Sequence, residues 1–250
     1  MMASPLNETT GNDMEKKDSK ALMLMVILTF VMAGSIVVYS LFMEERQFFF
    51  ICLAIMVLSI CLLFIDTERR RPRTGEVVVV ASMVTIAVIS RAAFFMLPQV
   101  KPIAAVVIIT GVALGPRIGF LTGALSAFIS NFFFAQGPWT PCQMFALGMT
   151  GMISAAIIRK SSLFVRPLPM ALIGGACTFI VYGGIVDLWT AFGFNPEPTP
   201  GSALTVYAMA LPLDAVFAVT TALILFFIGI PMIKKLDRVK TRYGMFRSMA

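Results

Sequence analysis

Histidine is absent from this chain of 250 residues. Its absence excludes Ser–His and Cys–His catalysis, HExxH protease chemistry and histidine-ligated metals. The chain also lacks a GxxxxGKS/T phosphate loop, a pair of Asp-rich diphosphate motifs and a GxSxG nucleophile turn. We therefore expect a protein that is not an enzyme, holds no cofactor or metal, and does not bind ATP through a P-loop.

Charged residues are also scarce. They make up 13% of the chain, about half of the ~25% that is usual for soluble domains. Apolar residues make up 58%, and the mean hydropathy is +0.89. A soluble domain of this size could not bury so much apolar surface, so the composition predicts a polytopic membrane protein.

Apolar segments alternate along the chain with short polar or Gly- and Pro-rich connections. The eight segments cover residues 21–43, 47–65, 77–97, 103–114, 118–135, 142–158, 168–194 and 203–233. They predict an all-α membrane protein with eight transmembrane helices, preceded by a disordered polar tail over 1–20. The 12 residues of 103–114 span only about 18 Å as a helix. That segment must therefore extend past its apolar limits, or be kinked and shielded by its neighbours.

Basic residues gather on one side of this predicted topology. With the N-terminus inside, the inner segments hold 17 of the 20 Lys and Arg residues, and the outer loops hold two. The positive-inside rule then places both termini in the cytoplasm, together with the basic loop 66–76 and the basic tail 234–250. The net charge of +7 is therefore an orientation signal and a contact for anionic lipids of the bilayer, and does not indicate a nucleic-acid partner.

Three charged residues fall inside predicted spans: Arg91, Asp187 and Asp214. Each costs on the order of 2.5–3.5 kcal/mol to insert, so each needs a reason. All three fall in the outer half of the bilayer. Arg91 and one aspartate could form a structural ion pair, or all three could line a polar cavity open to the outside. Two carboxylates against one guanidinium favour the cavity slightly.

The outer loops 98–102, 136–141 and 195–202 are rich in proline and carry amides and one aromatic side chain. Stiff loops hold a binding geometry without a large ordering cost. Trp139 and Trp189 are placed at the outer interface, where the alternative role for each is an aromatic-belt anchor.

Two helix faces complete the predicted site. Small or polar residues recur every four positions at Gly119, Gly123, Ala127 and Asn131, opposite a lipid-facing row of Leu121, Leu125, Phe128, Phe132 and Phe133. In the last span one face carries Tyr207, Leu211 and Asp214. We expect the substrate-binding residues to be Arg91, Gln99, Lys101, Asn131, Gln136, Trp139, Gln143, Tyr182, Asp187, Trp189, Asn195, Tyr207 and Asp214.

With the loops placed outside, the middle of the chain resembles a known family. The resemblance is carried by LPQVKP at 97–102, GVALGPRIGFLTGALSA at 111–127, Ser130-Asn131, GPWTPCQM at 137–144 and GMTG at 148–151. These segments resemble the S-component, the substrate-binding membrane subunit, of energy-coupling factor (ECF) vitamin transporters. The resemblance covers about 77–233 and implies a six-helix substrate-binding core in a bacterial plasma membrane.

S-components capture a vitamin or its precursor near the outer face. They work with a transmembrane scaffold subunit and two cytoplasmic ABC-type ATPases. The GPWTP segment most resembles the cobalamin or cobalamin-precursor type, although a pyrimidine, a pterin or a queuosine-like precursor also suits the residues. The two spans in 21–65 are additional to the family core. The family's small-xxx-small docking motif appears only as a weak match at Ala81 and Thr85.

Three other functions remain open from the residues alone. A stand-alone secondary transporter or channel would couple an ion or proton through Asp187 or Asp214. An integral membrane enzyme is disfavoured by the missing histidines and acid-rich motifs. A purely structural subunit is the last alternative.

Overall fold

In the computed structural model, the residues described are 57, 58, 60, 61, 73–160, 166–193 and 200–245. All the elements in these residues are helices: α3 (Thr74–Ala93), α4 (Ile103–Leu114), α5 (Pro116–Phe134), α6 (Thr140–Lys160), α7 (Pro167–Cys177), the π-helical η2 (Thr178–Gly183), α8 (Gly184–Gly193), α9 (Pro200–Ile224), the π-helical η3 (Leu225–Gly229) and α10 (Ile230–Tyr243). The all-α class is confirmed.

These elements form six helical rods, because α7, η2 and α8 follow one another without a break, as do α9, η3 and α10. Five rods are long and apolar enough to cross a membrane. This confirms the prediction of several apolar helices that could span a membrane. The predicted spans 21–43 and 47–65, the tail 1–20 and most of the loop 66–76 lie outside the described residues, so the total of eight spans stays a prediction.

The boundaries of α3 differ from the predicted ones at both ends. The helix begins at Thr74, inside the predicted loop 66–76, because the Glu76 carboxylate accepts a hydrogen bond from the Arg73 backbone N–H over 3.2 Å. Such a bond satisfies a donor at the helix N-terminus that would otherwise lack a partner. The helix ends at Ala93 instead of Leu97, and the apolar residues that follow it lie in an exposed turn.

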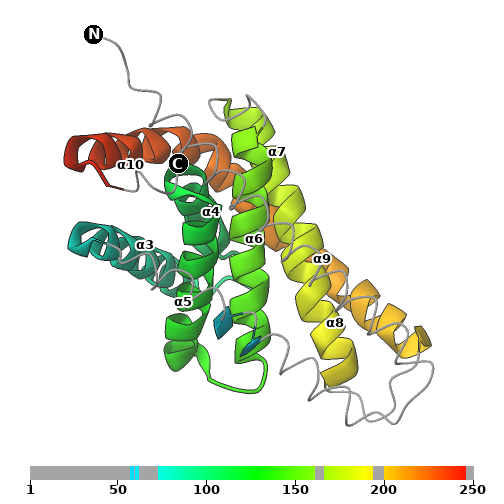
Figure 1. The fold of residues 1–250 in the computed structure, drawn as a ribbon. Helices are drawn as coiled ribbons and strands as arrows, with labels where there is room; N and C mark the ends of the chain where they lie inside the picture. The colour runs from blue at the N-terminus through cyan, green and yellow to red at the C-terminus, as the bar shows by residue number, and fades with distance from the viewer. Residues whose placement is uncertain (1–56, 59, 62–72, 161–165, 194–199, 246–250) are drawn as a thin grey trace.

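The short helix α4 is enclosed by its neighbours. All twelve of its residues are buried, and it packs against α3, α5, α6 and α10 (Figure 1). The helix stops at Gly115, whose φ of 125° suits glycine, and Pro116 then opens α5. Of the two predicted alternatives for this segment, shielding by neighbours is the correct one, and the helix keeps its apolar limits.

Glycines bring α4, α5 and α6 into backbone contact. A Cβ at Gly123 of α5 would lie 2.6 Å from the Leu147 carbonyl oxygen of α6, and one at Gly119 would lie 2.8 Å from the Gly111 Cα of α4. The opposite face of α5 is outward, with Phe132 65% exposed and Phe133 73% exposed. The small inner face is therefore confirmed, and the apolar outer face is confirmed at Phe128, Phe132 and Phe133. The prediction is wrong for Leu121 and Leu125, which pack against the core.

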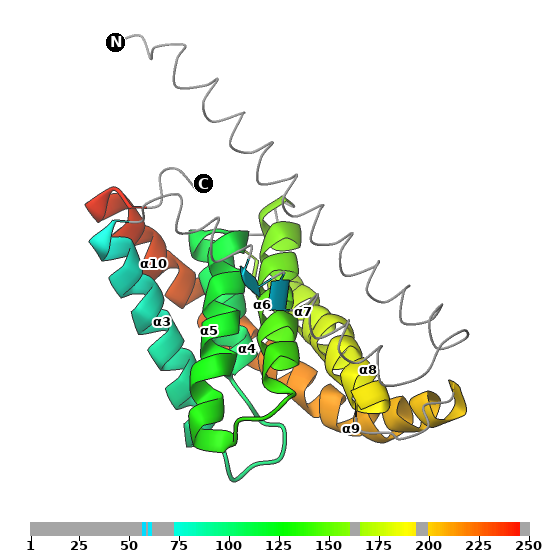
Figure 2. The same ribbon diagram turned by 60° about the horizontal axis from the view of Figure 1, so that its bottom comes forward.

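The other rods are less regular. Figures 1 and 2 show α8 and the first part of α9 side by side, reaching away from α5. The rod that contains α8 passes through the π-helical turn η2, and α9 contains Pro212. Both features interrupt the regular pattern of backbone hydrogen bonds in an α-helix, and such interruptions often lie at functional positions.

Candidate functional site

The C-terminal end of α3 presents Arg91 to α5. Its Nη1 atom donates hydrogen bonds to Ser130 Oγ at 2.6 Å and to Asn131 Oδ1 at 3.0 Å. Its guanidinium lies 4.8 Å from the centre of the Phe134 ring, a favourable cation–π distance. Within the described residues Arg91 pairs with a hydroxyl, an amide and a ring. The predicted ion pair between Arg91 and an aspartate does not form there.

Asn131 extends this network to α6. Only 1% of its side chain is exposed, and its Nδ2 atom donates to Gln143 Oε1 at 2.9 Å and to Thr140 Oγ1 at 3.2 Å. The Thr140 hydroxyl in turn donates to Gln136 Oε1 at 2.8 Å. The resulting chain of bonds from Arg91 to Gln136, called here the Asn131 network, connects α3, α5, the turn before α6, and α6 itself.

Two further predicted residues lie in the turn between α3 and α4. Lys101 Nζ donates to Gln99 Oε1 at 2.8 Å, and Gln99 adopts a positive φ of 57°. Burial lowers the pKa of Lys101 to about 8, and the nearby charge of Arg91 acts in the same direction. The positive charge of Arg91, which belongs to the Asn131 network, therefore acts on Lys101. Together with burial it makes Lys101 lose its proton at a lower pH than an ordinary lysine.

The turn before α6 holds Trp139 half buried. Its ring lies directly against Gly137, where any Cβ would collide with it. The same turn is fixed by the Gly137 N–H, which donates to Thr140 Oγ1 at 3.3 Å. The predicted stiffness of this turn thus has a structural basis in the packing of the ring and in the Asn131 network.

A second polar cluster joins α8 and α9. The carboxyl groups of Asp187 and Asp214 lie close enough to interact with each other, and Asp187 is only 7% exposed. Two neighbouring carboxyls can form a hydrogen bond only when one of them carries a proton, because ionised carboxylates only accept. The Tyr207 hydroxyl donates to the Gly184 carbonyl oxygen at 2.8 Å. A Cβ at Gly183 would lie 2.6 Å from Asp214 Oδ2, so this glycine of η2 makes room for the carboxyl group.

Tyr182 of η2 connects the two clusters. Its ring packs edge-on against Phe217 of α9, with 5.1 Å between the ring centres. Its hydroxyl lies within the electrostatic range of Arg91 and of both Asp187 and Asp214. Side chains from α3, α5, α6, η2, α8 and α9 therefore converge in one region of the bundle.

Other predicted residues lie elsewhere. Trp189 is buried, with 6% exposed, in an apolar cluster with Phe120, Cys142 and Phe145, so its position inside the bundle differs from the predicted outer interface. Leu211 is largely exposed, although Tyr207 and Asp214 on the same helix face inward. Ala81 and Thr85 lie on the exposed face of α3. Asn195 lies outside the described residues.

Three contributors were not among the predicted site residues: Ser130, Thr140 and Phe134. Ser130 directly precedes Asn131, and Thr140 lies four positions after Gln136, a spacing that places the two side chains together at a helix start. These two sequence relationships could have identified Ser130 and Thr140 as site residues. The contact of Phe134 with Arg91 depends on the packing of α3 against α5 and leaves no such signal.

Comparison of the chain with protein-family models, with curated proteins and with solved structures finds no match. Within the part of the chain that the structure describes, no three His, Cys, Asp or Glu side chains come together as metal ligands. The chemistry of the region must therefore be argued from its own groups: one guanidinium, one ammonium, two carboxyls, four amides, two phenols and an indole.

Proposed function

We propose that this protein is the substrate-binding subunit of an ECF-type importer. In this proposal it captures a vitamin or vitamin precursor at the outer face of a bacterial plasma membrane. It would deliver the substrate inward with a transmembrane scaffold subunit and two cytoplasmic ATPases. The observation that carries the proposal is the convergence of the Asn131 network, Tyr182 and the Asp187–Asp214 pair inside an otherwise apolar bundle. Polar groups at this depth are expensive and mark functional sites.

The distribution of charge supports the orientation in this proposal. The N-terminal end of α3 and the C-terminal end of α10 meet, since Arg73 Nη1 donates to the Gly244 carbonyl oxygen at 3.3 Å. Arg159, at the end of α6, and the basic residues of α10 lie near this end, and the polar convergence lies toward the other. The basic end would then be cytoplasmic, with both termini inside and eight spans in total.

The chemistry of the converging groups suggests the class of ligand. Amides both donate and accept, the carboxyl pair can accept or donate, and the half-buried Trp139 offers a flat apolar surface. Such a set suits a sizeable polar molecule with many amide-like groups and a flat face. Cobalamin or a cobalamin precursor is the favoured ligand, in agreement with the resemblance of the GPWTP segment.

The exposed face of α3 is the proposed docking surface for the scaffold subunit. Ala81 is small, and the Thr85 hydroxyl is already bonded to the Ala81 carbonyl oxygen at 2.8 Å. This surface therefore offers close packing without an unsatisfied polar group. Ala81→Leu should abolish co-purification with the scaffold subunit, and retained co-purification would refute docking through this face.

Titration of the purified full chain with cyanocobalamin in detergent tests the ligand. Trp139→Ala should weaken binding by about 1 kcal/mol, roughly fivefold, with expression unchanged. Phe133→Ala is the matched control, because it removes an aromatic ring from the outward face of α5. Equal affinities of the wild type and both variants would remove Trp139 from the site, and no binding by the wild type would refute a cobalamin ligand.

A stand-alone secondary transporter is the second candidate, favoured by the neighbouring carboxyls of Asp187 and Asp214, which could share a proton. A shared proton in a membrane helix pair is a known device for coupling transport to a proton gradient. Uptake into vesicles that contain this chain alone, driven by a pH gradient and abolished in Asp187→Asn, would support it. Uptake that requires ATPase partners would exclude it.

A further inference from the structure

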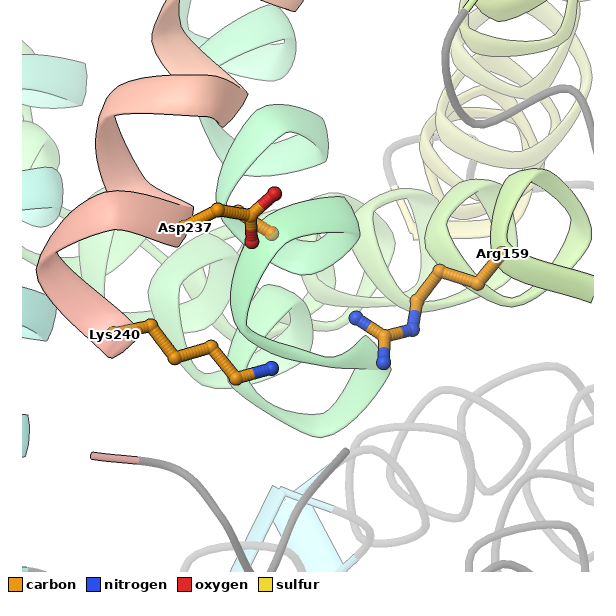
Figure 3. Close-up of a pocket in the computed structure, with 4 residues that line it drawn as sticks. Arg159, Asp237 and Lys240 are labelled. Carbon is orange, nitrogen blue, oxygen red and sulfur yellow. The ribbon is translucent and has the colours of Figure 1, made fainter. Parts of the chain in front are cut away.

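A pocket of about 330 Å³ lies away from the polar convergence, at the basic end of the bundle. It is lined by Ala113 of α4, Arg159 of α6, and Asp237 and Lys240 of α10 (Figure 3). Gln143 and Arg159 lie 16 positions apart on α6, which corresponds to about 24 Å along a helix. The pocket is therefore separate from the site proposed for the transported substrate.

The pocket has an excess of positive charge. Figure 3 shows Arg159 and Lys240 extending toward each other from α6 and α10, with Asp237 on the same side as Lys240. The charges of Arg159 and Lys240 repel, and Asp237 attracts both. One carboxylate against two cations leaves one positive charge unbalanced, so an anion that enters the pocket would relieve the repulsion.

Arg159 is held in place by the end of α4. Its Nη1 atom donates to the Val112 carbonyl oxygen at 2.9 Å, one of the last carbonyls of that helix. The neighbouring Ala113 has a small side chain and leaves open space beside the guanidinium. A fixed guanidinium with open space beside it suits an oxyanion, because its planar donors match phosphate oxygens.

The position of α10 indicates how deep in the bilayer this pocket lies. Ile233 is buried, and Leu236 and Val239 pack against the core, whereas Lys234, Lys235 and Arg238 point outward. An amphipathic helix with basic residues on its polar face, directly after a membrane-spanning helix, lies in the headgroup region of a bilayer. The pocket thus opens where phospholipid phosphates are most concentrated.

We propose that the Arg159–Lys240 pocket binds the phosphate group of an anionic phospholipid and so fixes α10 against the membrane surface. Basic pockets between transmembrane helices are established sites for such headgroups. The covalent link of the phosphate to its acyl chains would keep it at the pocket mouth. A soluble phosphate would have to be drawn from solution.

Phosphatidylglycerol added to the full chain in neutral detergent micelles tests this proposal. Bound lipid is counted by native mass spectrometry, and the unfolding midpoint is measured in parallel. Lys240→Gln should weaken the apparent affinity about fivefold. Lys235→Gln makes the same charge change on the outward face of α10 and should alter the affinity by less than about twofold. Asp237→Asn should tighten binding about fivefold, because it removes the negative charge from the pocket.

Tighter binding in Asp237→Asn cannot arise from misfolding, so the three variants keep the proposal testable even if one is unstable. Equal losses in Lys240→Gln and Lys235→Gln would show diffuse attraction to α10 and overturn the pocket. Equal binding of zwitterionic phosphatidylcholine would overturn selection for an anionic headgroup. Full competition by inorganic phosphate at millimolar concentration would assign the pocket to a soluble anion instead of a lipid.

Discussion

The two polar clusters lie in helices that are built differently. The Asn131 network lies on α3, α5 and α6, which are regular helices, and α5 and α6 meet at glycines with backbone contacts. The Asp187–Asp214 pair lies on α8 and α9, beside the π-helical η2 and close to Pro212. Many large apolar side chains of α9 are exposed, whereas α4 has none exposed.

The difference shows two ways to hold polar groups in an apolar bundle. In the Asn131 network each side chain is bonded to another side chain across closely packed helices, so the geometry is set by rigid elements. In the carboxyl pair, an irregular helix and a glycine provide the space for two neighbouring acids, which can form a hydrogen bond when one of them is protonated. We expect the first cluster to orient a ligand and the second to be the more easily displaced.

Breaking the contact between α5 and α6 should have the largest effect. Gly123→Leu would place its Cβ 2.6 Å from the Leu147 carbonyl oxygen, a backbone atom that cannot give way without moving a helix. We expect a loss of more than about 3 kcal/mol in the free energy of unfolding, measured by thermal unfolding in detergent. Gly184→Ala in the second region meets no heavy atom within 4 Å and should be neutral or slightly stabilising. An equal loss of unfolding free energy in both variants would contradict the proposed difference in packing between the two regions.

Removing the centre of the Asn131 network comes next. Asn131→Ala deletes three hydrogen bonds and takes away the donor to Gln143 Oε1, while Arg91 and Thr140 keep other partners. Thermal stability should fall by about 2 kcal/mol, together with ligand affinity. Gln136→Ala, at the exposed edge of the same network, should cost less than about 0.5 kcal/mol. If both variants lost the same stability, the network would not be centred on Asn131.

A smaller effect is expected in the second region. Tyr207→Phe removes only the hydroxyl that donates to the Gly184 carbonyl oxygen, and the unfolding free energy should fall by about 1 kcal/mol. Tyr243→Phe is the control, because Tyr243 is exposed at the end of α10. An effect of Tyr207→Phe as large as that of Asn131→Ala would erase the distinction between the two regions.

A prediction of a different kind is a pH dependence that arises from Lys101. Its pKa of about 8 in the folded chain lies below the ordinary value of 10.5. Between these two values the unfolded chain binds more protons, so this residue makes stability rise as pH increases from about 8 to 10.5. The rise in unfolding midpoint should disappear in Lys101→Gln and persist in Lys235→Gln. A flat wild-type profile would show that Lys101 is not buried beside Arg91.

Much of the fold could be predicted from the sequence because it depends on local patterns. The apolar run 103–114 matches α4 at both ends, and the small face of α5 follows from its four-residue spacing. The predicted end of α3 was wrong by four residues, because the apolar Phe94–Leu97 segment resembles the span it follows. Hydropathy alone does not separate an apolar turn from an apolar helix.

Less of the candidate site could be predicted, because it depends on which helices are neighbours. Arg91 and the two aspartates were recognised by their cost in a membrane, yet only packing decided their partners. Arg91 faces α5 and bonds to Ser130 and Asn131, which leaves the aspartates to pair with each other. Trp189 illustrates the same limit, since its burial against α6 depends on how α8 packs.

The sequence by itself determined the all-helical class of the protein, the limits of α4 and the small inner face of α5. Hydropathy, helical periodicity and the positions of glycine and proline are properties of single segments, and they act before any two helices meet. Only the tertiary structure decided that Arg91 has no aspartate partner among the described residues, that the carboxyls of Asp187 and Asp214 lie side by side, and that Arg159 and Lys240 face each other. These outcomes depend on distances between rods far apart in the chain, which the packing of side chains sets.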